Sequence, residues 1–354
     1  MILNEAGKSY ADQLFTEPVE VTAPGVRFLD CRFQGSDPNQ VLLRPGPATT
    51  VDHCTLTGSP NGQRAGIRLD NAANVRVLNS TIRNIYHVSD AQAISGDNGV
   101  ANLIVDGCYL EASGENVIFG GSDPQDEAHI PQDILIRRCT MTKPLGWRDQ
   151  QHGTCKNLFE LKNAKRVTLE DCDLSYSWVH GQIGFGVVLT VRNQDNTAPW
   201  STLDDIIVRR NIIRAVAGGF QILGTDYTNP SATSKRMTIE DNRVEIDSAY
   251  GWNGRSFQIG GHPEDLTIRR NLVRGTGIQT MITFSEGAPL PRFTFTDNDL
   301  YEGEYGVFGD GVALGTVALE TYAPNCVWSG NIVRRDPQVG RNIPYPAGTE
   351  VVML

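Results

Sequence analysis

Short stretches that alternate apolar and polar residues run along the chain, separated by tight corners. In the middle of the chain, Leu158–Lys162 alternates, a turn follows, and Val167–Leu169 and Asp173–Ser175 lie on either side of a corner at Cys172. Alternation over a few residues indicates strands rather than helices. Three such strands describe one three-sided turn of chain, which buries its inward side chains only if similar turns stack on it.

The same pattern recurs with a period of about 30 residues. Each repeat has two or three strand residues, then two polar residues and a small corner residue. The corners are Cys31, Cys54, Ser80, Cys108, Cys139, Cys172, Asn211, Asn242, Asn271, Asn298 and Asn331. We therefore predict an all-β chain of three-strand coils, with about eleven coils stacked in sequence order at roughly 4.8 Å spacing.

Pairs of like charges precede the corners of the middle coils, and their sign alternates. They are Arg137-Arg138, Glu170-Asp171, Arg209-Arg210, Glu240-Asp241 and Arg269-Arg270. If successive coils lie directly above one another, each basic pair contacts an acidic pair, which is the arrangement that cross-strand neighbours prefer. We interpret these arginines as structural and not as a nucleic-acid interface.

The corner residue changes from Cys to Asn at position 211 and stays Asn to position 331. Asn tolerates a left-handed corner, and its amide can bond to the amides above and below it. On these residues the chain resembles the right-handed parallel β-helix proteins of the pectate-lyase-like superfamily, in which an asparagine ladder is characteristic. That scaffold serves polysaccharide lyases, glycoside hydrolases and tailspike-type proteins, so the resemblance implies a fold more than a function.

We expect one β-helix domain over residues 25–335, because a solenoid core grows lengthwise and no linker divides the chain. Residues 1–24 are predicted to cap one end, with a short amphipathic helix or an irregular plug at Asn4–Thr16. Residues 336–354 are rich in Pro and Gly and are predicted to form a tail that is not strand-like and that covers the last coil. Neither end carries the heptads of an oligomerisation stalk, so we expect a monomer.

The composition of the chain limits which kinds of partner and which cellular locations we expect. The net charge of −10 and the mixing of acids with bases argue against nucleic acid, and no apolar run is long enough for membrane insertion. Seven cysteines without a CxxC pair are expected to be buried free thiols. The β-helix resemblance implies an extracellular or periplasmic protein, although Met1–Ala6 lacks the pattern of a signal peptide; a phage particle is the alternative.

Long loops gather between Cys108 and Asn242, which places the candidate site over the middle coils. Stacking the first strands of these coils predicts an inward apolar row and an outward polar row. The outward row holds Glu160, Lys162, Thr190, Arg192, Gln221 and Gln258. In this stacking Glu160 lies opposite Thr190, and Lys162 lies opposite Arg192 at roughly 5 Å.

Two interpretations of this row compete. In the structural one, Glu160 pairs with Lys162 and Arg192 pairs with a loop carboxylate such as Asp195, which gives a solvated surface of little energetic weight. In the functional one, Lys162 and Arg192 face a groove that binds an acidic oligosaccharide or polysaccharide through its carboxylates and sugar faces. The further predicted contacts are Asn116, Asn157, Trp147, Trp178, His180, Trp200, Gln221 and Gln258.

The resemblance to pectate lyases implies a chemistry, β-elimination on a glycan that contains uronic acid. Such a reaction needs a base for the proton α to the carboxylate and a cation for the developing enolate. Lys162 or Arg192 could fill either role, with Glu160 near a Ca²⁺-ligand position of the family and His180 as an alternative base. Asn157 stands where the family has an acid, so Ca²⁺ is an implied cofactor only, and we assign no metal site.

Two alternatives stay open. A glycoside hydrolase on this scaffold would need two carboxyls either about 5 Å or about 6.5 to 9.5 Å apart. The acids near the outward row are Asp90, Glu115, Glu160 and Asp226, without a paired-acid motif on the first strand. The other alternative is a rod without catalytic activity that binds glycan on a cell surface or in a phage tail.

Overall fold

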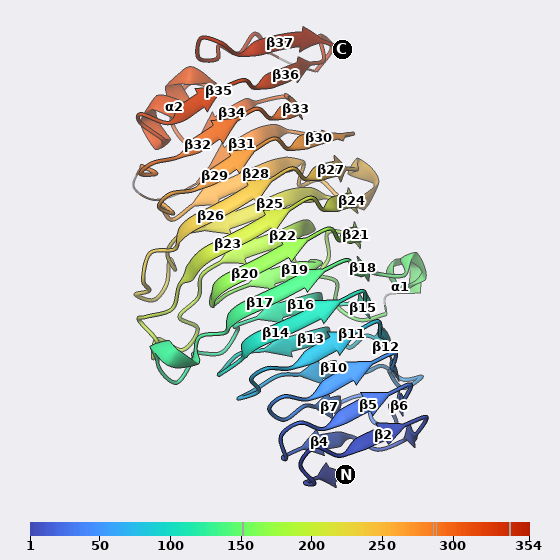
Figure 1. Ribbon diagram of the computed structural model, residues 1–354. Coiled ribbons are helices and arrows are strands. Elements are labelled where there is room, and N and C mark those ends of the chain that lie inside the picture. The colour runs from blue at the N-terminus through green and yellow to red at the C-terminus, as the bar shows by residue number, and fades with distance from the viewer. Residues whose placement is uncertain (151, 286, 288, 340) are drawn as a thin grey trace.

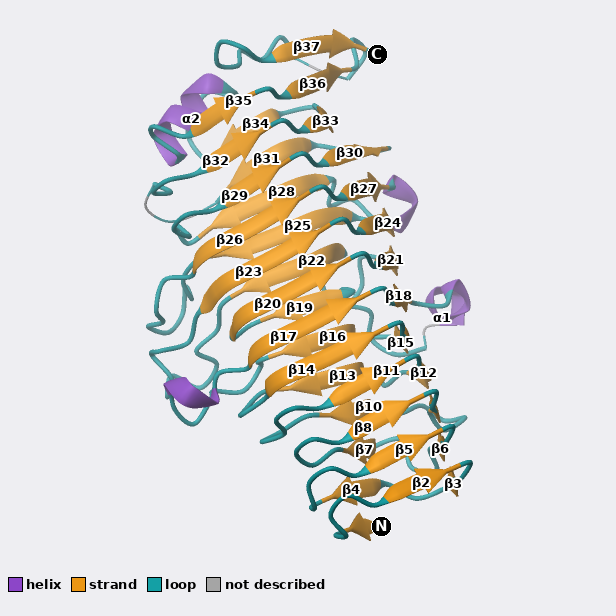
Figure 2. Ribbon diagram, viewed as in Figure 1, coloured by secondary structure: helices purple, strands orange, loops and turns teal. Residues whose placement is uncertain are grey.

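Three long parallel sheets form the three sides of the molecule, and each coil of chain contributes one strand to each sheet. The computed structural model describes residues 1–354 except positions 151, 286, 288 and 340. The coils stack in chain order, with the two termini at opposite ends (Figure 1), and strands make up most of the stack (Figure 2). The fold is a right-handed parallel β-helix, as predicted.

The sheets are named A, B and C in the order in which the chain visits them. Sheet A contains β1 (Ile2–Leu3), β4 (Val19–Val21), β7 (Val41–Arg44), β10 (Ala65–Arg68), β13 (Gln92–Gly96), β16 (Glu115–Phe119), β19 (Phe159–Leu161), β22 (Phe185–Thr190), β25 (Gly218–Leu223), β28 (Arg255–Gly260), β31 (Thr280–Phe284) and β34 (Gly306–Gly309). Sheet B contains β2 (Ser9–Ala11), β5 (Arg27–Leu29), β8 (Thr50–Asp52), β11 (Arg76–Leu78), β14 (Ala101–Asp106), β17 (Gln132–Arg137), β20 (Ala164–Glu170), β23 (Leu203–Arg209), β26 (Lys235–Glu240), β29 (Thr267–Arg269), β32 (Thr294–Thr296) and β35 (Val327–Ser329). Sheet C contains β3 (Leu14–Phe15), β6 (Arg32–Gln34), β9 (Thr55–Thr57), β12 (Thr81–Ile85), β15 (Tyr109–Ala112), β18 (Thr140–Thr142), β21 (Asp173–Ser177), β24 (Ile212–Val216), β27 (Arg243–Ile246), β30 (Leu272–Gly275), β33 (Asp299–Tyr301), β36 (Ile332–Arg335) and β37 (Glu350–Met353).

The hydrophobic core fills the inside of the stack and follows from the alternation along each strand. Phe159, Leu161 and Leu189 are buried, as the stacking predicted from the sequence requires. The ring centroids of Phe220 and Phe257, on neighbouring coils, are 5.3 Å apart and their rings are nearly parallel. Because each coil contacts only its neighbours, the core continues from coil to coil without a boundary.

The corner between sheets B and C carries the predicted asparagine ladder. The side-chain oxygen of Asn242 accepts hydrogen bonds from the backbone and side-chain N–H groups of Asn211, both at 3.0 Å. Asn242 donates in turn to Asn271 at 3.0 Å, and the series continues through Asn298 to Asn331. The residue before most of these corners has a positive φ, for example Asp241 at 57°, so a left-handed corner is built into each coil.

The ends of the chain correct two expectations. Residues 1–24 contain β1 to β4, which pair with the following coil, so the helix or irregular plug expected at Asn4–Thr16 is wrong. The tail was expected not to be strand-like, yet β37 extends sheet C in parallel with β36. With these strands the sheets have 12, 12 and 13 strands among the described residues, which agrees with the prediction of about eleven coils.

Helices are short and lie outside the stack. They are α1 (Leu145–Gln150), α2 (Thr316–Tyr322) and the 3-10 helices η1 (Glu127–His129) and η2 (Ser248–Tyr250). Among the described residues, no helix is long and apolar enough to cross a membrane. The seven cysteines are free thiols, and all of them except the half-buried Cys326 are buried.

Candidate functional site

The outward row of sheet A crosses the middle coils in a register that differs from the one expected. Glu160 pairs with Ile118 on one side and with Val188, not Thr190, on the other. Val188 pairs with Gln221, and Gln221 with Gln258. A slip of two residues leaves every side chain on its own face, so the alternation of apolar and polar residues could not detect this error.

Lys162 and Arg192 still lie on neighbouring coils, because the backbone N–H of Arg192 donates to the carbonyl of Lys162 at 3.0 Å. Each cation has an acidic partner. Nζ of Lys162 lies 3.8 Å from Glu160, and Nη1 of Arg192 lies 3.3 Å from Asp226 rather than from the expected Asp195. These carboxylates offset the repulsion between the two cations.

Two polar hollows on the outer face of sheet A meet at Lys162, and together we call them the sheet A groove. The smaller, of about 240 Å³, is lined by Glu160, Lys162, Gln182, Ile183, Val188, Thr190, Arg192 and Gln221. The larger, of about 380 Å³, is lined by Arg64, Arg68, Asp90, Gln92, Asp97, Glu115, Ile118, Gly120, Gly121, Ser122 and Lys162. Charged and amide groups dominate this lining, which contains no aromatic residue among the described positions.

An ionic cluster missed from the sequence lies at one end of the larger hollow. Nζ of Lys156 is 3.1 Å from Asp90 Oδ1 and 3.1 Å from Glu115 Oε1. Glu115 is fully buried and accepts a hydrogen bond of 3.0 Å from Gln92. Burial and the nearby Glu115 carboxylate raise the pKa of Asp90, although Lys156 opposes this shift. Asp90 therefore holds a proton more readily than an ordinary aspartate.

In Lys156 the effect of the neighbouring charges on the pKa is larger than the effect of burial. Burial lowers the pKa of Lys156, but the carboxylates of Glu115 and Asp90 outweigh burial and raise the pKa overall. Asp90 and Glu115 had been named as acids near the outward row, but nothing in the sequence repeat brings Lys156 between them. It lies in the long insertion before β19, outside the alternating pattern.

Arg68 and Asp97 form a second ion pair in the larger hollow. The Arg68 side chain donates to Asp97 and also to Asp70 at 2.8 Å, while Ser122 donates to Asp97 at 2.8 Å. Asp97 directly follows β13, and Gly120 directly follows β16. Since Gly96 pairs with Phe119 and Phe119 with Leu161, Asp97, Gly120 and Lys162 stand on three successive coils. Gly120 has a φ of 78°, and a Cβ at this position would clash with the backbone nitrogen of Asn163, so the close approach of these coils requires glycine.

Asn116 and Asn157 were expected to contact a ligand, but both are fully buried. Asn157 donates to Glu160 at 2.7 Å and to Gln182 at 3.0 Å, so it positions two residues of the groove. Asn116 donates to two backbone carbonyls and accepts a hydrogen bond of 2.9 Å from Lys143. Both asparagines hold neighbouring groups in place, and neither side chain is exposed in the groove.

The expected aromatic wall is also absent from the groove. Trp147 and Trp178 are buried in a separate cluster with Cys155, where they pack the α1 loop against the stack. Trp200 is half-buried, and it lines neither hollow. The exposed His180 accepts a hydrogen bond from the backbone of Cys155 at 3.1 Å and does not line the groove either. Of the expected site residues, the structure brings together Glu160, Lys162, Arg192 and Gln221; Gln258 continues the same row.

The residues around Glu160 do not fit the Ca²⁺ site that the pectate-lyase resemblance implies. Ca²⁺ takes six to eight oxygen ligands. One oxygen of Glu160 accepts from the Asn157 amide, and the other faces the Lys162 ammonium, which would repel a cation. Within the described part of the chain, no group of three or more His, Cys, Asp or Glu side chains could hold a metal ion.

Lys143 lies beneath the groove as a fully buried cation. Its ammonium donates to the carbonyls of Ala112 at 2.9 Å and Gly114 at 2.6 Å, and to the side chain of Asn116. Burial lowers the pKa of Lys143 to about 8. Lys143 thus ties together the corner on which Glu115 is mounted, and no residue pattern around it marked this role in the sequence.

Comparisons with known proteins show that this chain is similar to them in fold. No family model and no curated sequence matches the chain. A tailspike protein of E. coli bacteriophage HK620, in complex with a pentasaccharide, is 12% identical with a TM-score of 0.64 over 94% of this chain. PfbA, a surface adhesin of Streptococcus pneumoniae, is 12% identical with a TM-score of 0.62 over 96% of this chain and 84% of its own. The match covers 60% of the tailspike chain.

Proposed function

We propose that this chain binds an oligosaccharide or polysaccharide in the sheet A groove. The observation that carries the proposal is the meeting of two polar hollows at Lys162, which forms one charged, amide-rich surface across several coils. A surface that repeats from coil to coil suits a linear polymer. The tailspike that shares this fold is in complex with a pentasaccharide, which supports a glycan as the ligand class.

The lining favours a glycan that carries carboxylates. Lys162 and Arg192 can each donate to a carboxylate, and Gln221 can bond to hydroxyl groups as donor or acceptor. Asp97 and Asp90 supply acceptors for sugar hydroxyls in the larger hollow. Because the groove lacks an aromatic platform among its described residues, its selectivity rests on hydrogen bonds and charge rather than on ring stacking.

Cleavage of the bound glycan is a second candidate, and Lys162 favours β-elimination. The Lys162 side chain lies 3.8 Å from Glu160 and can donate to an oxygen that develops negative charge, which suits Lys162 to stabilise an enolate. Hydrolysis would need a second carboxyl at a defined separation from Glu160. Asp97 lies two coils from Glu160 and two residues out of register with it, because Ser95 and Ile118 are the residues in line with Glu160. This arrangement favours elimination over hydrolysis.

The same proposal includes a place of action outside the cell or on a phage particle. Both solved structures named above belong to surface parts, a phage tailspike and a surface adhesin. An extracellular glycan is the partner that such a location would provide.

A glycan array of neutral and uronate-containing oligosaccharides, followed by calorimetry and a product assay on the hits, tests these statements. We expect binding to uronate-containing glycans. Elimination then gives an unsaturated product that absorbs in the ultraviolet, hydrolysis gives new reducing ends without that absorbance, and simple binding gives heat alone. Absence of binding to every glycan at millimolar concentration overturns the proposal.

A further inference from the structure

The outer face of sheet B carries a second charge ladder in addition to the one expected from the sequence. This ladder lies at the edge where each strand of sheet B begins, whereas the expected ladder lies where each strand ends. Its members are Lys165-Arg166, Asp204-Asp205, Lys235-Arg236 and Glu264-Asp265, with Asp133 before them and Arg292 after them. Lys165 pairs in register with Asp204, Asp204 with Lys235, and Lys235 with Glu264.

The two ladders are in opposite phase. Strand β20 begins with Lys165-Arg166 and ends with Glu170-Asp171, while β23 begins with Asp204-Asp205 and ends with Arg209-Arg210. The next two coils repeat the same reversal. Each coil therefore carries opposite charges at its two edges, and each edge changes sign from one coil to the next.

These charges are paired within the chain. The second residue of each doublet remains accessible, whereas Glu170, Asp204 and Glu240 are mostly buried. Arg236 lies 2.6 Å from Asp205, and their side chains are 45% and 43% exposed. Arg210 and Asp171 at the other edge are 2.8 Å apart and 43% and 42% exposed. The exposed members of both ladders can therefore bond to groups outside the chain as well as to their neighbours in the same ladder.

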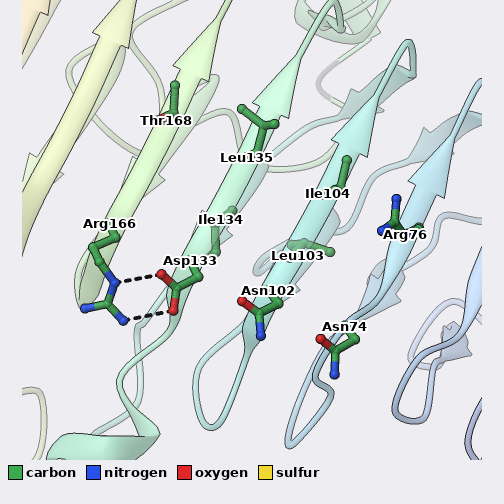
Figure 3. Close-up of a pocket in the computed structure, with 10 residues that line it drawn as sticks. All are labelled: Asn74, Arg76, Asn102, Leu103, Ile104, Asp133, Ile134, Leu135, Arg166 and Thr168. Carbon is green, nitrogen blue, oxygen red and sulfur yellow. Dashed lines mark hydrogen bonds and ion pairs between the residues drawn. The ribbon is translucent and has the colours of Figure 1, made fainter.

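An uncharged floor runs between the ladders. Its half-buried residues follow one register row, Ile104, Leu135, Thr168, Ile207, Thr238, Thr267 and Thr294. A shallow hollow of about 440 Å³ covers the first coils of this row, with Asn102, Asp133 and Arg166 along one side (Figure 3). This hollow is larger than either part of the sheet A groove, but it holds no buried ionisable group.

We propose that this face of sheet B binds a second copy of the same chain, with the two stacks side by side and pointing the same way. A two-fold axis parallel to the stack exchanges the two edges of sheet B and keeps every coil at its own level. Because the ladders are in opposite phase, Lys165-Arg166 of one copy then meets Glu170-Asp171 of the other, and the same match repeats at each coil.

A partner of uniform charge does not fit this face. A polyanion such as nucleic acid would be repelled by every second coil at both edges. An alternating partner must also repeat at the coil spacing of roughly 4.8 Å, which the chain's own face does. The sequence-based expectation of a monomer rested on the absence of heptads alone. It took no account of the charge pattern on the outer faces of the sheets.

The area of this face of sheet B indicates how strongly the two copies should associate. Seven coils at roughly 4.8 Å and about six residues at roughly 3.3 Å give a face of about 35 by 20 Å, near 700 Å² per copy. Stable interfaces bury about 800 Å² per partner, so the dimer should form in a concentration-dependent way. The charge ladders make it sensitive to salt, since exposed charges are screened.

Sedimentation velocity on the whole chain, from 1 to 500 µM in 50 and 500 mM NaCl, tests the proposal. We expect a dimer at the higher concentrations and a dissociation constant at least tenfold larger in 500 mM salt. Ile207→Lys places an ammonium at the centre of the face and should abolish the dimer. Ile212→Lys makes the same change on sheet C, beyond the Asn211 corner, where Ile212 is 45% exposed, and should leave the dimer intact.

Several outcomes overturn the proposal: a monomer under all conditions, a trimer, or equal effects of the two lysine variants. Circular dichroism shows whether Ile207→Lys is folded, and Thr238→Lys replaces it if it is not. Thr168→Cys and Thr294→Cys with a short bis-maleimide settle the orientation, because a parallel axis links each cysteine to its own counterpart at both levels. The unmodified chain controls for reaction at Cys326.

Discussion

Arg210 and Asp171 form a two-pronged ion pair, with Nε to Oδ1 and Nη2 to Oδ2 both at 2.8 Å, although 39 positions separate them in the chain. Arg270 and Asp241 repeat the same geometry at 2.8 Å two coils later. These contacts form only if successive coils lie in register. The alternating charges that stood out in the sequence are therefore direct contacts between neighbouring coils.

The ion pairs predict how stability depends on pH. Hydrogen bonding to an arginine holds the pKa of Asp133, Asp171, Asp205, Asp241 and Asp265 below its ordinary value. The unfolded chain therefore binds more protons than the folded chain near pH 4 and below. The stabilisation is present above about pH 4 and is lost as pH falls through the folded pKa values.

Urea unfolding at pH 7, 5 and 3.5 measures this effect. The free energy of unfolding should fall between pH 5 and 3.5, and 1 M NaCl should reduce the fall. Asp241→Asn should make the free energy of unfolding depend less on pH. Asp310→Asn is the control and should leave this pH dependence unchanged, because Asp310 is exposed and has no basic partner among the described residues. Equal stability at pH 7 and 3.5 would contradict the prediction.

The asparagine ladder predicts a large cost for a small change. Asn242→Ala removes an acceptor for two N–H groups of Asn211 and a donor to the carbonyl of Val208. Since these partners are buried, we expect a loss of roughly 3 kcal/mol in the free energy of unfolding. Asn61→Ala, at an exposed position, is the control and should change it by less than about 0.5 kcal/mol.

The buried Lys143 predicts a stability change with a distinct pH signature. Lys143→Met leaves the carbonyls of Ala112 and Gly114 without their donor, and we expect a loss of about 2 kcal/mol. The folded pKa of Lys143, about 8, lies below its unfolded value, so the unfolded chain binds more protons between these values. The free energy of unfolding of the wild-type chain should therefore rise relative to that of Lys143→Met between pH 8 and 10. The difference between the wild-type chain and the control Lys8→Met should show no such rise.

The sheet A groove predicts separate effects on binding and folding. Lys162→Ala and Arg192→Ala should each weaken binding of an acidic glycan at least tenfold, since each removes a charged donor from the same hollow. Melting temperatures should change little. Arg243→Ala, on an exposed position of sheet C, is the control. Wild-type affinity in both groove variants would show that the ligand binds elsewhere.

The repeating features of this chain could be predicted from its sequence. Asn211, Asn242 and their counterparts mark one corner of each coil, and alternation assigns residues such as Phe159 to the core. The register of sheet A could not be fixed, because pairing Glu160 with Thr190 or with Val188 gives the same inward face. The second charge ladder could not be recognised because Lys165-Arg166 and its counterparts lie where each strand begins, with no recognisable corner residue after them.

Only those parts of the candidate site that follow the repeat could be placed from the sequence. Glu160, Lys162 and Arg192 lie on or beside regular strands and come close together, but in a register two residues from the expected one. Lys156, Trp147 and Trp178 belong to loops or insertions, whose paths depend on packing against the stack, so their contacts do not follow from spacing in the sequence.

A crystal structure of the chain with the oligosaccharide that binds most tightly in the array shows where the glycan lies. We expect sugar density across the outer face of sheet A, with a sugar carboxylate or hydroxyl within hydrogen-bonding distance of Lys162 Nζ. Density on sheet B, on sheet C or in the loops around α1, with the sheet A groove empty, would contradict this expectation.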